Sequence, residues 1–163
     1  MGGSDEQTTA ASEFEILAPV SGELVHLENT NDPAFSSRAV GDGVAVVPQE
    51  GTVCAPVSGT VAALFPTEHA LGIMSDDSSA QVMLHIGIDT VKLEGKGFHA
   101  LVAQGDHVDA GQPLVEVDFD AVRAAGFDPT VFVIVCERSE NSTLREHASG
   151  PVAAKEPVIW LSE

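Results

Sequence analysis

The chain has 163 residues, 44% of them hydrophobic, and a formal net charge of −18, because 25 acidic residues stand against only seven lysines and arginines. A chain of this length forms one domain of ordinary size and needs neither a metal nor a disulfide to fold. The negative charge excludes nucleic acid and anionic membranes as good partners and favours a basic protein, although solubility or adaptation to salt explains the same overall excess.

Short strands make up most of the predicted structure. Residues 1–14 are small, polar and acidic, so we expect a disordered leader or a cloning remnant, followed by a single domain over 15–163. Runs rich in valine and isoleucine, separated by Gly, Pro, Asn and Asp, predict strands at 24–25, 44–47, 61–65, 82–84, 114–117, 131–135 and 158–161. One short helix is predicted at 119–125, with Asp118 as its cap and Gly126 at its end. The fold class is therefore all-β, an antiparallel β-sandwich or jelly-roll-like barrel with one or two short helical turns.

A repeat supports this prediction. The sequence APVSGELV at 18–25 returns as APVSGTVA at 55–62. Two copies favour a pseudo-symmetric barrel over a solenoid. The glycine-valine loop at 105–114 is of the kind found in lipoyl and biotin carrier barrels.

The cysteines and the hydropathy pattern indicate a cytoplasmic protein. Cys54 and Cys136 lie in apolar stretches without a metal-type spacing, so both are predicted to be free thiols. No apolar run is long enough to span a membrane, and no signal peptide is recognisable.

His85 is the strongest candidate for chemistry. It ends an apolar run, with Gly87 two residues later and Asp89 four residues later. Glycine lets the backbone fold close to the ring, where a carbonyl can hold one ring nitrogen and leave the other free. A neutral imidazole with a pKa of about 6.5 is a competent nucleophile near pH 7. His69 lies sixteen residues earlier, and two strands of a hairpin could bring the histidines together. The other histidines, His26, His99, His107 and His147, have no accompanying pattern.

Several ordered motifs together resemble the glucose-type enzyme IIA component of the bacterial phosphoenolpyruvate-dependent sugar phosphotransferase system. The resemblance covers about residues 15–163. The matching motifs are ILAPVSG at 16–22, VGDGVA at 40–45, APVSGTV at 55–61, HA at 69–70, HIGIDTV at 85–91, GKGF at 95–98 and GDHV at 105–108. The resemblance implies a jelly-roll-like β-sandwich and a phosphocarrier, a phosphotransferase component that forms a phosphohistidine.

The resemblance also implies roles for particular residues. His85 would accept a phosphoryl group from the small carrier HPr and pass it to a cysteine of a IIB domain. His69 would hydrogen-bond the phosphoryl oxygens, with Thr67 orienting it. The backbone carbonyl of Gly87 would fix the tautomer of His85 so that Nε2 attacks.

Partner docking is implied for residues around this pair. The family pattern makes Asp32 and Asp89 carboxylates that meet an arginine of HPr, although Asp89 is also a common turn residue and a formal candidate for a base. An apolar ring matches Phe35, Val40, Phe65, Met83 and Val91. Several of these are equally well explained as core residues. Met83, Pro66 and Glu68 depart from the usual family residues, which bears on partner choice.

Other readings remain open from the sequence. No cofactor is required, but His69 and His85 could share a zinc ion if a partner supplied a further ligand. Regulation by the unphosphorylated protein is an alternative function. A lipoyl or biotinyl carrier is disfavoured because Lys92 and Lys96 lack a hairpin-tip setting, and a zinc peptidase because no later H-x-H motif follows His85. The sugar, and whether the chain is free or a tethered permease domain, are not encoded in these motifs.

Overall fold

The computed structural model describes residues 13–162. The predicted leader therefore lies outside the described residues, except for its last two positions. Glu13 and Phe14 belong to the first strand and pair with Ser162 and Leu161 near the end of the chain. Phe14 also packs against the core.

Fourteen strands of the described residues form three sheets. The strands are β1 (Glu13–Leu17), β2 (Gly22–His26), β3 (Asp42–Pro48), β4 (Thr52–Cys54), β5 (Gly59–Leu64), β6 (Ala70–Ser75), β7 (Ala80–Ile86), β8 (Phe98–Ala100), β9 (His107–Val108), β10 (Pro113–Val117), β11 (Val131–Arg138), β12 (Thr143–Glu146), β13 (Gly150–Val152) and β14 (Pro157–Ser162). The large sheet has the order β13-β2-β3-β11-β7-β6-β5-β9, and the small sheets have the orders β1-β14-β12 and β4-β10-β8. All pairings are antiparallel, so the predicted all-β antiparallel class is confirmed.

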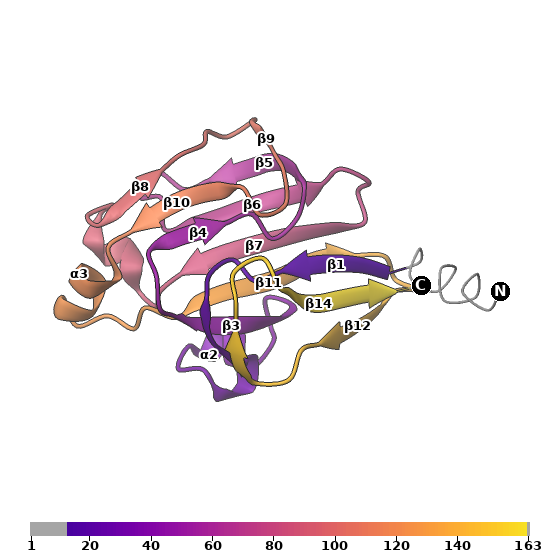
Figure 1. The fold of residues 1–163 in the computed structure, drawn as a ribbon, viewed down its shortest axis with the longest axis horizontal. Coiled ribbons are helices and arrows are strands. Elements are labelled where there is room, and N and C mark those ends of the chain that lie inside the picture. Colours follow the sequence, from indigo (N-terminus) through magenta and orange to yellow (C-terminus); the bar gives the residue numbers. More distant parts are fainter. Residues whose placement is uncertain (1–12, 163) are drawn as a thin grey trace.

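The two small sheets lie over one face of the large sheet, as Figure 1 shows. The alternation of buried and half-buried residues along β7 explains this packing. Ala80, Val82, Leu84 and Ile86 point into the main core, whereas the residues between them point to the opposite face. One face of the large sheet therefore closes the sandwich, and the other remains available for a functional site.

The repeat at 18–25 and 55–62 corresponds to a pseudo-twofold arrangement. The Leu17 N–H donates to the Pro56 carbonyl, and the Cys54 N–H donates to the Pro19 carbonyl, so the two copies bond each other reciprocally. The Ser21 and Ser58 hydroxyls accept from the N–H groups of Ala154 and Ala110 in equivalent turns. The strand order of the large sheet is consistent with the same symmetry, with β11 and β7 as the central pair.

Short helices cover the remaining edges. The predicted helix is α3 (Phe119–Ala124), and the Asp118 carboxylate caps it by accepting from Ala121 N–H. A second helix, α2 (Pro33–Ser36), was not predicted. Asp32 caps it and Pro33 occupies its first position, a combination that favours helix initiation. The 3-10 turns η1 (Leu27–Asn29) and η2 (Thr90–Leu93) complete the set of helical elements within residues 13–162.

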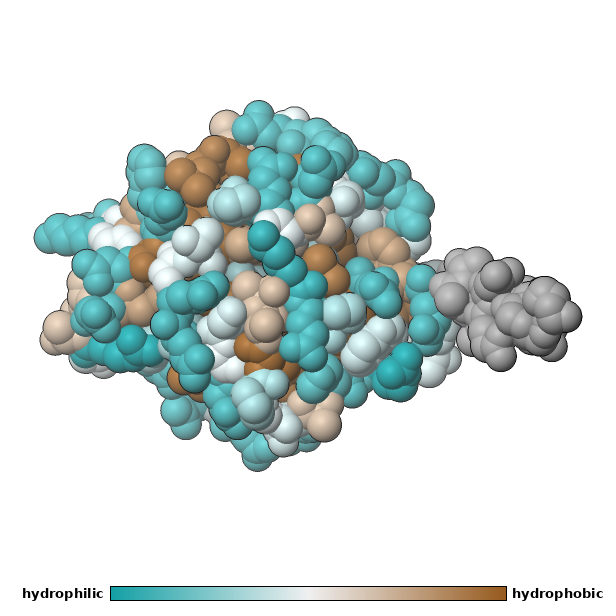
Figure 2. Space-filling model, viewed as in Figure 1, coloured by the Kyte–Doolittle hydropathy of each residue, from teal (hydrophilic) through white to brown (hydrophobic). Residues whose placement is uncertain are grey.

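A smaller apolar cluster lies on the face of the large sheet opposite the main core. Its buried members are Leu27, Phe35, Ala45, Phe132 and Ile134, contributed by η1, α2, β3 and β11. Polar side chains cover most of the molecular face in Figure 2, with apolar patches between them. None of the helices within residues 13–162 has the length and apolar character needed to cross a membrane. Both Cys54 and Cys136 are free thiols, as predicted.

Candidate functional site

His85 stands near the end of β7, on the face opposite the main core. Its Nδ1 lies 2.8 Å from the carbonyl oxygen of Gly87, which can only accept a hydrogen bond, so the ring carries its proton on Nδ1. Nε2 then carries the lone pair. No hydrogen bond within residues 13–162 engages that Nε2, so it is the nitrogen available for reaction.

Gly87 is required by the backbone at this turn. Its φ is +82°, and a Cβ placed there would lie 2.4 Å from Cγ2 of Thr90 and 3.1 Å from the carbonyl oxygen of Asp128. The Gly87 N–H donates to the Thr130 carbonyl at 2.8 Å, and the Thr90 hydroxyl donates to the carbonyl of Ile86. These bonds hold the peptide so that the Gly87 carbonyl faces the ring of His85.

His69 immediately precedes β6 and is brought to His85 by the β6–β7 hairpin. Ala70 lies opposite His85 in the register, and the Ile86 N–H donates to the His69 carbonyl at 2.8 Å. The Thr67 hydroxyl lies 2.6 Å from Nδ1 of His69. The hairpin expected from the sequence is therefore present, and each histidine has its Nδ1 engaged by a group two residues away in the chain.

The two imidazoles meet edge to face. Their ring centroids lie 5.1 Å apart at an interplanar angle of 84°. Burial, and to a smaller extent the nearby His85 ring, lower the pKa of His69 from 6.5 to about 4. Burial also lowers the pKa of His85, opposed by the Gly87 carbonyl and by the charges of Asp32 and Asp89. Both rings are consequently neutral near pH 7, the state in which an imidazole nitrogen can act as a nucleophile.

Aromatic rings support the histidine pair. Phe132 lies opposite His85 on β11, with the ring centroids 6.3 Å apart. Phe35 stacks on Phe132 at 4.4 Å and approaches His85 at 5.2 Å. Phe65 meets His69 edge-on at 5.5 Å. The rings restrict both imidazoles and exclude water from one side of them.

The remaining predicted residues are of two kinds: exposed side chains, which form what we call the rim of the site, and side chains buried in the smaller apolar cluster. Val40, Phe65 and Val91 are 38%, 46% and 50% exposed, respectively, although large apolar side chains are usually buried. Phe35 is buried and Met83 is half-buried, so these two belong mainly to the smaller apolar cluster.

The two predicted docking carboxylates also have positions in turns. Asp32 caps α2 through Oδ1, which accepts from Ala34 N–H at 3.0 Å. Asp89 is exposed, adopts a left-handed φ of 62° and makes no side-chain capping bond to η2. The ring nitrogen that a base at Asp89 would engage, Nδ1 of His85, is bonded to the Gly87 carbonyl instead.

Two residues near the site were not singled out as site residues from the sequence. Phe132 lies within an apolar run that predicts only a strand, and its position opposite His85 depends on strand register. Glu68 has a left-handed φ of 64°, and its carboxylate accepts from Ala100 N–H at 2.6 Å. This bond ties the segment that carries His69 to β8. In the sequence, Glu68 was noted only as a departure from the usual family residues.

The donor set is incomplete for a resident metal ion. Among residues 13–162, no group of three or more His, Cys, Asp and Glu side chains converges on one point. Two imidazole nitrogens satisfy half of a tetrahedral zinc site, so further ligands would have to come from another molecule. The predicted conditional zinc site therefore stays a prediction.

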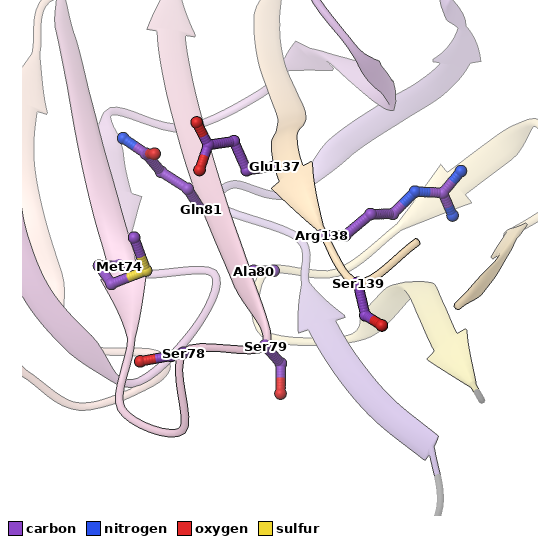
Figure 3. A pocket seen from close by; sticks show the side chains of 8 residues that line it. All are labelled: Met74, Ser78, Ser79, Ala80, Gln81, Glu137, Arg138 and Ser139. Carbon is purple, nitrogen blue, oxygen red and sulfur yellow. The ribbon is translucent and has the colours of Figure 1, made fainter. Parts of the chain in front are cut away.

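A hollow of about 240 Å³ lies at the other end of the hairpin from His85. Figure 3 shows the side chains of Gln81 and Glu137 pointing to one side and that of Arg138 to the other. Ser78 and Ser79 of the β6–β7 turn complete one edge. None of the predicted site residues lines this hollow.

The fold and this site match one family throughout. The family model described as phosphoenolpyruvate-dependent sugar phosphotransferase system, EIIA 1, matches residues 14–141, which include both histidines. This chain belongs to that EIIA family. The match includes the whole β4-β10-β8 sheet, every strand of the large sheet except β13, and most of β1, so it is not restricted to a local motif.

Curated relatives and a solved structure agree with the assignment. The chain is 42% identical over 144 residues to the PTS system glucose-specific EIICBA component of Streptococcus pneumoniae, covering 88% of this chain and 20% of that one. It is 40% identical over 161 residues to the PTS system beta-glucoside-specific EIIBCA component of Bacillus subtilis, covering 98% and 26%, respectively. The chain therefore spans about a fifth to a quarter of the length of these relatives. The glucose permease IIA of Mycoplasma capricolum superimposes with a TM-score of 0.83 at 34% identity, covering 91% of this chain and 95% of that one.

Proposed function

We propose that this EIIA domain is a phosphocarrier that accepts a phosphoryl group on Nε2 of His85 from phosphorylated HPr and passes it to a cysteine of a IIB domain during sugar uptake. The observation that carries the proposal is the bond between Nδ1 of His85 and the Gly87 carbonyl. It sets the tautomer that leaves Nε2 as the reactive nitrogen. Family membership supports the same role.

The chemistry requires positioning more than bond activation. The lone pair of Nε2 forms a bond to phosphorus while the phosphorus–nitrogen bond of the donor breaks, and the donor ring keeps that electron pair. Positive charge develops on the His85 ring as the new bond forms. The Gly87 carbonyl, 2.8 Å from Nδ1, stabilises that charge without a proton leaving the ring.

His69 supplies the second part of the mechanism. With the Thr67 hydroxyl donating to Nδ1, Nε2 of His69 is protonated and can donate to a phosphoryl oxygen. Because burial keeps the pKa of His69 at about 4, this donor is neutral at pH 7. A neutral donor holds the phosphoryl group more weakly than a cation would, and weak holding suits a group that must be passed on.

Docking depends on the exposed rim. Val40, Phe65 and Val91 present exposed apolar surface, Phe65 contacts His69, and the negative charges of Asp32 and Asp89 act on His85. A visiting protein with an apolar centre and a nearby arginine fits this arrangement. A zinc ion held by His69, His85 and a ligand from a partner would use the same two nitrogens, so it would compete with phosphorylation.

Labelling with phosphoenolpyruvate, enzyme I and HPr tests the proposal. One acid-labile phosphate should appear per chain, and His85→Gln should abolish it. His69→Gln should still be loaded but should transfer the group poorly to a IIB domain. Labelling of the His85→Gln chain, or a phosphate on His69, would show that the roles are assigned wrongly.

A further inference from the structure

Within residues 13–162, two of the three lysines that form no ion pair lie in one loop beside the histidine pair. The described residues contain all seven lysines and arginines of the chain. All four arginines form ion pairs, as in Arg38 with Glu146 and Arg145 with Glu13, whereas no lysine within residues 13–162 does. Lys92 and Lys96 lie within the same exposed loop, and only Lys155 lies elsewhere. The protein has a net charge of −18, so a loop with two lysines that form no ion pair is a local site of positive charge on an otherwise acidic protein.

The loop at 89–97 runs from the surroundings of one histidine to those of the other. It begins at Asp89, two residues after the glycine whose carbonyl holds His85, and the Lys92 N–H donates back to the Asp89 carbonyl. At its far end, a Cβ on Gly95 would lie 3.7 Å from the carbonyl oxygen of Thr67, so the loop packs against the residue that bonds His69. Lys96 follows directly.

The loop is held in one conformation by its backbone. Asp89, Glu94, Gly95 and Gly97 all have left-handed φ values, and the N–H groups of Glu94 and Lys96 donate to the carbonyls of Val91 and Leu93. Glu94 is exposed between the two lysines, but no ion pair joins it to either of them. The backbone positions of Lys92 and Lys96 are therefore fixed beside the site, and both side chains are exposed to a visiting protein.

We propose that Lys92 and Lys96 form an orienting contact for the phosphoryl donor, which must carry carboxylate side chains where it faces this loop. The inference rests on the proposed phosphocarrier function. The rim is then bipolar, with Asp32 and Asp89 attracting cations and the two lysines attracting anions. A donor surface with the opposite pattern is held in one rotational orientation over His85, which a uniformly acidic rim could not achieve.

The donor is a better occupant of this contact than the acceptor. The relatives from Streptococcus pneumoniae and Bacillus subtilis are named EIICBA and EIIBCA components, and the matched segment is about a fifth to a quarter of each. An acceptor within the same chain meets the site at high effective concentration and gains little from steering. A separate donor arrives by diffusion, where charge complementarity raises the association rate most.

Reversing the charge of Lys92 and of Lys96, first singly and then together, tests the proposed contact with the phosphoryl donor. Lys92→Glu and Lys96→Glu should each slow loading of His85 by about threefold at low ionic strength, and the double variant by about tenfold, because complementary rim charges act mainly on association. The double variant Lys92→Gln/Lys96→Gln, which removes the charges without reversing them, should be loaded at a rate between those of the unaltered chain and the double charge-reversed variant. In about 0.5 M salt these differences should shrink to less than twofold, since exposed charges are screened. Lys155→Glu makes the same change in net charge at the β13–β14 turn and should leave loading unchanged.

Cross-linking tests the chemistry of the donor directly. A water-soluble carbodiimide condenses a lysine amine with a contacting carboxylate, forming an amide with loss of water. Peptide mass spectrometry should then find Lys92 or Lys96 joined to an aspartate or glutamate of the donor. Lys92→Arg/Lys96→Arg should keep the loading rate but lose this cross-link, because a guanidinium retains the charge and does not couple.

Several results would overturn the inference. They are unchanged or faster loading in the charge-reversed variants, an equal effect of Lys155→Glu, and a defect confined to transfer to the IIB domain. A donor that cross-links only through other lysines would also overturn it. If the unaltered chain is not loaded at all, the proposed function fails and this inference fails with it. If the unaltered chain and every lysine variant are loaded at the same rate, this inference fails but the proposed phosphocarrier function stands.

Discussion

The buried position of His69 predicts a specific dependence of folding stability on pH. His69 is 3% exposed, and its pKa falls from the ordinary value of 6.5 to about 4 in the folded chain. The unfolded chain therefore binds a proton in a pH range where the folded chain does not. Stability supplied by the neutral ring is present above pH 6.5 and is lost as the pH falls toward 4.

The magnitude follows from the size of the shift. Each pKa unit is worth about 1.4 kcal/mol, so the full effect is about 3 kcal/mol, of which about 2 kcal/mol is already lost at pH 5. Replacing His69 by Gln removes this contribution from both states. The variant lacks this loss, so its free energy of unfolding, measured relative to that of the unaltered chain, should rise by about 2 kcal/mol between pH 8 and pH 5.

Urea denaturation of both chains at the two pH values measures this difference, and proton NMR titration of the ring gives the pKa itself. Replacement of the exposed His99 by Gln controls for the loss of one imidazole from both states. The reasoning is refuted if the stability difference at His69 is the same at pH 8 and pH 5, or if it changes in the opposite direction.

Three further substitutions test the supports of the site. Gly87→Ala should destabilise the chain by more than about 2 kcal/mol in thermal or urea unfolding, because the new Cβ meets the Thr90 side chain at a left-handed φ; an effect below about 0.5 kcal/mol would contradict this. Phe132→Ala should cost about 3–5 kcal/mol, since it removes a fully buried ring from the smaller apolar cluster, and a loss under about 1 kcal/mol would show that the cluster collapses around the gap. Thr67→Val keeps the side-chain shape but removes the hydroxyl bonded to His69, so phosphoryl transfer to a IIB domain should slow while stability changes little; unchanged transfer kinetics would rule out the orienting role.

The central strands could be predicted from the sequence because each combines an apolar run with clear turn residues. β3, β7 and β11 are examples, and α3 was predicted from its cap at Asp118. β6 was not predicted, because Ala70–Ser75 contains a glycine and no alternation. β8, β9 and β13 have only two or three residues, which gives periodicity no room to appear.

Only part of the histidine site could be predicted from the sequence. The glycine two residues after His85 indicated that a backbone carbonyl could approach the ring, and the Gly87 carbonyl does so. The bond from the Gly87 N–H to the Thr130 carbonyl, which helps to hold it there, joins residues far apart in the sequence. The burial of Phe35 and the contact of Phe132 with His85 depend on packing between segments far apart in the chain. The hydrogen bond from Ala100 N–H to Glu68 spans 32 residues, and no local pattern predicts it.

The most direct test of the account is the position of the phosphorus–nitrogen bond. The chain is labelled with ¹⁵N-histidine and phosphorylated, and ³¹P–¹⁵N couplings are then read by NMR. Coupling to Nε2 of His85 is expected, because the Gly87 carbonyl occupies the Nδ1 side of that ring. Coupling to Nδ1 of His85, or to either nitrogen of His69, would contradict it.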